Sequence, residues 1–179
     1  MKLVRPDGST YNGEIKDGMR HGYGIQIWED GSKYEGSWQC DMANGHGRFD
    51  YSNGNTYIGM WFDDQAHGLG KLIQSDGGVY EGYWALNKKH GKGSETWPDG
   101  THFEGKYYEG LREGLGTMNF TDGAIYKGNF VNDEVQGKGI YEWPSGKVYD
   151  GSWKLHKMNG EGILSWKSGK KYSGSFLNN

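Results

Sequence analysis

Aromatic and polar positions alternate along this chain in a pattern that returns every 23 residues. Each interval opens with a Tyr-x-Gly-x-Trp segment, as at Tyr34–Trp38, and later carries a Gly-x-x-x-aromatic segment, as at Gly47–Tyr51. Alternate residues of a strand share a face, so the rings and the glycine of each segment lie together. The two segments predict two strands, and the polar stretch Asp63–Gly68 between them predicts the turn of a β-hairpin.

The interval divides the whole chain without insertion or deletion. It predicts one array over residues 1–179, in which 1–10 and 172–179 are partial units. The full units are 11–33, 34–56, 57–79, 80–102, 103–125, 126–148 and 149–171. A single hairpin is not stable in water, so stability has to come from the stacking of neighbouring units.

Glycine and aromatic residues occupy fixed columns of the repeat. Four columns hold all of the 33 glycines except Gly18, Gly78 and Gly110, and three columns are aromatic apart from Ile15 and Gln74. Glycine weakens a strand unless something uses its space, and a ring from a neighbouring strand can lie over it. The pattern predicts an all-β fold: an elongated, twisted, single-layer antiparallel sheet, a solenoid of tandem β-hairpins with an aromatic-lined groove.

This pattern resembles the MORN (membrane occupation and recognition nexus) repeat. The resemblance rests on Tyr34–Trp38 with Gly45–Gly47 and Gly54, and on Tyr80–Trp84 with His90–Gly93. It implies a scaffold that tethers cytoskeletal, motor or axonemal proteins, often near membranes. Two alternatives implied by the family stay open: a phospholipid-binding tether, and the regulatory repeat region of a larger enzyme.

The sequence offers little chemistry for catalysis. It has no phosphate-binding Gly-x-x-x-x-Gly-Lys-Ser/Thr motif and no evident Ser/His/Asp arrangement. His21, His67 and His90 share one repeat column, where adjacent copies stand roughly 10 Å apart, too far to hold one metal. We therefore expect no enzyme activity, no cofactor and no metal site.

Charge and cysteine content narrow the class of partner and the cellular compartment that we expect. The net charge of −3 gives no field that would favour nucleic acid. The single Cys40 allows no internal disulfide and is typical of a reducing compartment. Since the first residues have no apolar segment of the secretory kind, we expect a cytoplasmic protein associated with the cytoskeleton or a membrane.

The aromatic face is the first predicted binding surface. A single-layer sheet has no opposing layer, so the ring edges are expected to line an open groove, and tyrosine and tryptophan are common binding anchors. We expect a peptide or helix segment of a partner protein to lie in this groove. Its centre is predicted to be formed by Tyr34, Trp38, Tyr57, Trp61, Tyr80, Trp84 and Trp97.

The opposite face of the sheet, here called the back face, is polar in most units but apolar around residues 57–84. Several large apolar side chains on an expected solvent face exceed the usual scatter of surface apolar residues. This back-face patch is predicted to contact a protein. Its members are Ile58, Met60, Phe62, Leu69, Ile73 and Tyr83.

The end of the chain is basic and leaves a strand without a partner. Residues 147–179 carry six lysines against Asp150 and Glu161, and a basic end can contact anionic lipid headgroups. The lysines predicted for that contact are Lys154, Lys157, Lys167, Lys170 and Lys171. The chain stops after the first strand of a unit, which predicts either a fragment of a longer protein or a homodimer through the terminal repeats.

Overall fold

The computed structural model describes residues 2–4 and 6–178 and contains only strands and turns among them. By compactness the chain divides into a first unit, residues 1–89, and a second unit, residues 90–179. From here on, unit means one of these two parts, and each 23-residue interval is called a repeat. The strands are β1 (Lys2–Val4), β2 (Thr10–Lys16), β3 (Met19–Ile27), β4 (Lys33–Gln39), β5 (Met42–Asp50), β6 (Thr56–Phe62), β7 (Gln65–Ile73), β8 (Val79–Ala85), β9 (Lys88–Thr96), β10 (His102–Tyr108), β11 (Leu111–Asn119), β12 (Ile125–Val131), β13 (Glu134–Glu142), β14 (Val148–Lys154), β15 (Lys157–Ser165) and β16 (Lys171–Phe176).

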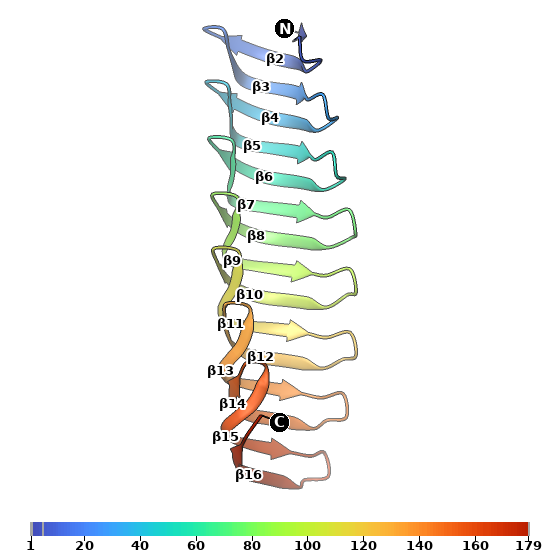
Figure 1. Ribbon diagram of the computed structural model, residues 1–179, viewed down its shortest axis with the longest axis vertical. Coiled ribbons are helices and arrows are strands. Elements are labelled where there is room, and N and C mark those ends of the chain that lie inside the picture. Colours follow the sequence, from blue (N-terminus) through green and yellow to red (C-terminus); the bar gives the residue numbers. More distant parts are fainter. Residues whose placement is uncertain (1, 5, 179) are drawn as a thin grey trace. The chain divides into compact units, whose positions relative to one another are not determined.

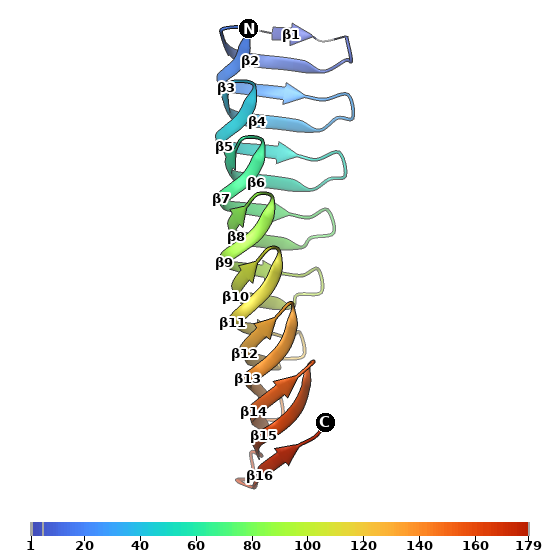
Figure 2. The same ribbon diagram turned by 60° about the vertical axis from the view of Figure 1, so that its left-hand side comes forward.

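The strands follow one another in the sheet in the order of the chain, and the sheet does not close on itself. Figure 1 shows the hairpins of the first unit stacked from β2 to β8, and Figure 2 shows the same for β10 to β16 in the second unit. The pairings described within each unit are antiparallel, as in β4 with β5 and β5 with β6. The predicted all-β, single-layer meander of hairpins is confirmed.

The hairpin turns are shorter than the sequence predicts. The stretch Asp63–Gly68 was expected to be a turn, but only Asp63 and Asp64 form it, and β7 already begins at Gln65. Both turn residues have positive φ, 46° and 62°, which is the backbone of a two-residue hairpin turn. Gly68 is instead a strand residue with φ of 71°, so its conformation, and not a turn, requires the glycine.

The tyrosine that opens a repeat lies on the glycines of its own hairpin. Gly36 and Gly47 face each other across β4 and β5, and the Tyr34 ring covers both. A Cβ added to Gly47 would lie 2.5 Å from Cζ and 2.6 Å from Cε2 of Tyr34. Tyr34 itself is only 1% exposed. Phe103 covers the equivalent glycines of its own hairpin, so this packing is the repeated core of both units.

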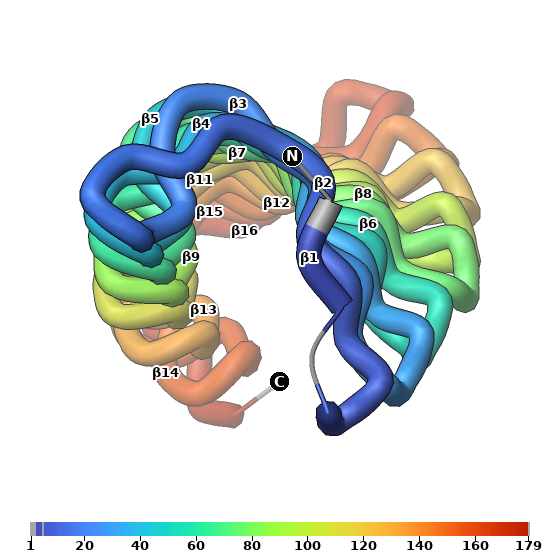
Figure 3. The backbone as a smooth tube through the Cα atoms, turned by 90° about the horizontal axis from the view of Figure 1, so that it is seen from above, coloured from blue at the N-terminus to red at the C-terminus, as the bar shows by residue number. Residues whose placement is uncertain are grey.

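A register shift in the hairpin of β4 and β5 accompanies the tyrosine contact. Between the pairs Gly36–Gly47 and Trp38–Ala43, one residue of β4, Ser37, faces three residues of β5, so the bulge lies in the second strand. The Tyr34 hydroxyl donates to the Ser37 carbonyl at 2.9 Å, so the backbone opposite the bulge and the buried phenol satisfy each other. Bulges bend strands, and the strands of each unit are visibly bent when seen end-on (Figure 3).

Within each compact unit, a tryptophan or phenylalanine joins a repeat to the repeat before it. Trp38 makes edge-to-face contacts with Tyr11 at 5.7 Å and with Tyr34 at 4.9 Å between ring centroids. Its indole nitrogen donates to the Gly24 carbonyl of the preceding hairpin at 3.1 Å. Such ring pairs contribute about 0.5–1.5 kcal/mol each beyond their buried area. In the second unit Phe130 takes this place between Phe103 and Tyr126.

The hairpin turn supplies a second link between neighbouring repeats. The Asp64 carboxylate accepts a hydrogen bond from the backbone amide of Ala43 at 2.7 Å, and the Asp64 amide donates to the Ala43 carbonyl at 3.0 Å. Asn87 binds Ala66 in the same way. This two-way contact fixes each turn against the start of the second strand of the preceding hairpin.

Candidate interaction surfaces

The seven predicted groove residues lie on the aromatic face, but six of them are buried. Tyr34, Tyr57 and Tyr80 are each 1% exposed, and burial raises the pKa of the Tyr34 and Tyr57 phenols well above the ordinary value. Trp38, Trp61 and Trp84 are buried as well, while Trp97 is half-buried. The Arg112 guanidinium lies 5.6 Å from the Trp97 ring centroid. A partner on this face would therefore touch mainly side chains at the strand ends, and binding in the groove stays a prediction.

The back-face patch extends over three neighbouring strands. Met60 and Phe62 on β6, Leu69 and Ile73 on β7 and Tyr83 on β8 are exposed, and Ile58 is half-buried. The register places Leu69 opposite Tyr83, and Met60 lies against Gly68 beside Leu69. An ion pair between Lys71 and Glu81, 3.2 Å long, lies between this row and the position of Ile73.

The five predicted lipid-binding lysines are exposed but do not form one cluster. Lys154 and Lys157 are paired at the hairpin turn between β14 and β15. Lys167, Lys170 and Lys171 lie at the other end of β15, in and after the turn that leads to β16. Since β15 has nine residues at about 3.3 Å each, the two groups are separated by roughly the length of that strand.

One inward-facing column was not predicted from the sequence, and it lies fifteen residues after the start of each 23-residue repeat. Gln26 is buried there and accepts a hydrogen bond from Arg20, whose guanidinium lies 4.0 Å from the Trp38 centroid. Glu95 occupies the same position and accepts a hydrogen bond from the Tyr107 hydroxyl at 2.9 Å. The signal was available, because this column has the parity of the strand glycines two residues earlier.

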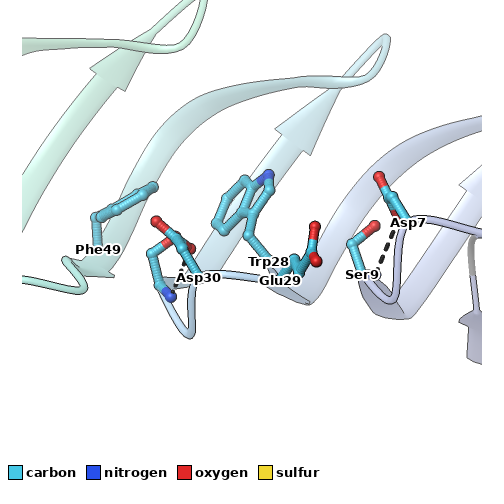
Figure 4. Close-up of a pocket in the computed structure, with 7 residues that line it drawn as sticks. Asp7, Ser9, Trp28, Glu29, Asp30 and Phe49 are labelled. Carbon is cyan, nitrogen blue, oxygen red and sulfur yellow. Dashed lines mark hydrogen bonds between the residues drawn. The ribbon is translucent and has the colours of Figure 1, made fainter.

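An open pocket of about 700 Å³ lies at the strand ends of the first unit. Trp28 and Phe49 supply its rings, 5.2 Å apart between centroids. Figure 4 shows Trp28 between Phe49 on one side and Asp7 with Ser9 on the other. The remaining lining residues are Glu29, Asp30 and Ser32. Hydrogen bonds from the Ser32 hydroxyl and amide hold the pKa of Asp30 below its usual range, which keeps that carboxylate charged.

Among the residues that the structure describes, no group of three or more His, Cys, Asp or Glu side chains is placed to hold a metal ion. The same residues form no helix with the length and apolar character of a membrane span.

A family model described as MORN repeat matches seven consecutive segments of this chain: 11–33, 34–56, 57–79, 80–102, 103–125, 126–148 and 149–171. The chain belongs to the MORN-repeat family. The matched segments have the boundaries that the tyrosine column predicts, and they cover most of the sequence. No curated protein matches this MORN array.

Two solved structures have a fold similar to that of the MORN array. One is the SAS-4 (dCPAP) TCP domain of Drosophila melanogaster in complex with a proline-rich motif of Ana2 (dSTIL), with 15% identity, a TM-score of 0.52, and coverage of 98% of this chain and 90% of that one. The other is the G-box domain of the microcephaly protein CPAP, for which a role in centriole elongation is suggested, with 14% identity, a TM-score of 0.55 and 99% coverage of both chains. At this identity the likeness concerns the fold.

Proposed function

We propose that this MORN array is a non-enzymatic scaffold that binds partner proteins. The observation that carries the proposal is the back-face patch, because five large apolar side chains are exposed together on one part of one face. Partner proteins commonly cover such a patch, whereas scattered single apolar residues need no explanation. The similar fold of the SAS-4 TCP domain, which is in complex with a peptide motif of Ana2, supports protein binding as the role.

The partner class that we propose is cytoskeletal, motor or axonemal protein, with the protein located at the cytoskeleton. The suggested role of the CPAP G-box domain in centriole elongation supports this choice. The aromatic face adds a second contact for a peptide or helix segment, through the half-buried and exposed rings at the strand ends.

Leu69 and Leu115 provide a matched test of the patch. They occupy the same repeat position and are 57% and 72% exposed, but only Leu69 lies in the back-face patch. We expect the array carrying Leu69→Glu and Met60→Glu to lose the partners that the unmodified array captures from a cytoskeletal extract. The Leu115→Glu array should retain them. Equal capture by all three proteins, each folded by circular dichroism, would remove the patch from the proposed function.

The exposed lysines support an alternative, a tether to anionic lipid. Binding to vesicles of phosphatidylcholine and phosphatidylserine should then weaken with salt and with Lys170→Glu plus Lys171→Glu. Binding that is absent or independent of salt contradicts this alternative. A homodimer through the terminal repeats is a further proposal, and sedimentation equilibrium tests it by the solution mass.

A further inference from the structure

The ring of Trp28 differs from related tryptophans in what lies next to it. Trp28, Trp97, Trp143 and Trp166 occupy the same position of the repeat, just after the second strand of a hairpin. In the second unit each of these rings has a cation of the chain beside it. Arg112 lies 5.6 Å from the Trp97 centroid, and Lys147 lies 4.5 Å from that of Trp143. Lys170 lies 5.4 Å from the Trp166 centroid.

No cation of the described residues takes that place at Trp28. The residue four positions after Trp143 is Lys147, and the one four positions after Trp166 is Lys170, whereas Ser32 stands four positions after Trp28. Ser32 is short, and its hydroxyl is bound to the Asp30 carboxylate at 2.6 Å. In the second unit a lysine side chain lies over the tryptophan ring at this position, whereas in the first unit the open pocket lies beside the Trp28 ring.

The charge of the turn is reversed as well. The residue after Trp28 is Glu29, whereas the residue after Trp166 is Lys167. Glu29 and Asp30 both line the pocket, and neither forms an ion pair within the described part of the chain. The Asp30 carboxylate stays charged because Ser32 donates two hydrogen bonds to it. An open indole face beside two carboxylates is complementary to a cation.

We propose that the pocket at Trp28 and Phe49 binds a lysine or arginine side chain of a partner segment. The cation lies over the Trp28 ring, as Lys147 and Lys170 lie over theirs, and the Glu29 and Asp30 carboxylates flank it. This inference rests on the proposed partner-binding function and names one part of the partner: a basic residue held at the strand ends of the aromatic face.

Acetylated tri-arginine amide is the probe, added to the full isotope-labelled chain and followed by the indole N–H signals in nuclear magnetic resonance spectra. We expect the Trp28 signal to shift with saturation, and the affinity to fall as salt rises. A tri-citrulline peptide, which keeps the shape of arginine without its charge, should cause no such shift. Trp28→Leu should weaken tri-arginine binding about tenfold or more.

A second variant places in the first unit the lysines that the second unit already contains at this turn. Glu29→Lys with Ser32→Lys gives the turn after Trp28 the lysines found after Trp166, so we expect it to fold and to lose tri-arginine binding. The matched control is Glu104→Lys with Ser173→Lys, two exposed residues away from the pocket, which makes the same change in net charge. This control should keep at least most of the binding.

Four results would overturn the inference. The first is that tri-arginine does not shift the Trp28 signal, and the second is that the control variant loses as much binding as Glu29→Lys with Ser32→Lys. The third is that a tetraproline peptide shifts the Trp28 signal as much as tri-arginine does and binds independently of salt. The fourth is that raising the protein concentration alone shifts the Trp28 signal. The last result would identify a second copy of the chain as the occupant. Partner capture that is lost with Leu69→Glu but unaffected by Glu29→Lys plus Ser32→Lys would retain the proposed function and reject this pocket.

Discussion

Gly47→Ala tests the contact between tyrosine and glycine on which each repeat is built. Gly47 lies in β5 under the Tyr34 ring, and its φ is outside the left-handed region, so alanine can adopt the same backbone. In an ordinary strand this exchange stabilises the protein by about 0.5–1 kcal/mol. Here the new methyl group would lie 2.5 Å from Cζ of Tyr34, so the ring has to move.

The cost of that movement can be worked out from the contacts of the ring. Overpacking costs about 1–3 kcal/mol, and the weakened hydrogen bond from the Tyr34 hydroxyl to Ser37 about 1 kcal/mol. The edge contacts with Trp38 at 4.9 Å and Trp61 at 5.4 Å are disturbed as well. We expect a loss of about 3 kcal/mol in the free energy of unfolding. Gly31→Ala should cost only about 1 kcal/mol, since that glycine has φ of 83° and open space around it.

A double-mutant cycle with Tyr34→Leu isolates the ring. Leucine lacks the atoms that the methyl group would meet, so Gly47→Ala should be neutral or slightly stabilising in the Tyr34→Leu background. Urea unfolding followed by tryptophan fluorescence gives both costs, provided that the slope with denaturant stays constant. If Gly47→Ala costs the same in both backgrounds, the ring is not what excludes a side chain at this glycine, and the packing argument fails.

Three further predictions concern single contacts. Asp64→Ala should destabilise the protein by about 1–3 kcal/mol more than Asp64→Asn, because only asparagine keeps an acceptor for the Ala43 amide, 2.7 Å away in the structure; urea unfolding measures the difference. Tyr107→Phe should cost about 1–3 kcal/mol by removing the hydrogen bond to the Glu95 carboxylate, whereas Tyr108→Phe, at an exposed ring, should be neutral in thermal melts. Burial raises the pKa of Tyr126 from 10.0 to about 12, so its contribution to stability is complete below pH 10 and is lost as pH rises through about 12. The tyrosinate absorbance of the buried tyrosines should then appear only together with unfolding, and ionisation of every tyrosine near pH 10 in a folded protein would contradict this.

The repeat boundaries and the contact of rings with glycines could be predicted because they depend on spacing alone. A strand fixes which residues share a face, so Tyr34 and Trp38 had to lie together. The hairpin turn was placed wrongly because glycine serves two purposes in this chain. Gly68 has positive φ within the bulged stretch of β7, and from sequence it resembles a turn residue.

Burial of the rings could not be predicted from the columns. A single-layer sheet was expected to leave one ring edge open, but Tyr34 is closed in by Trp38 of its own repeat and Trp61 of the next repeat. That depends on the orientation of each ring, which spacing does not determine. The lysines show a related limit, since Lys157 and Lys167 are near in sequence but lie at opposite ends of one strand. The back-face patch was predictable, because parity alone placed Leu69 and Tyr83 on the same face.

Photo-crosslinking at two positions tests the scaffold proposal most directly. A photoreactive amino acid replaces Met60 in the back-face patch or, in a second protein, Leu115 outside it, and each full chain is irradiated in a cytoskeletal extract. A bound partner on the patch predicts a discrete protein adduct from position 60 that position 115 does not give. The same adducts from both positions, or none from position 60, would contradict the proposal that this surface holds a partner.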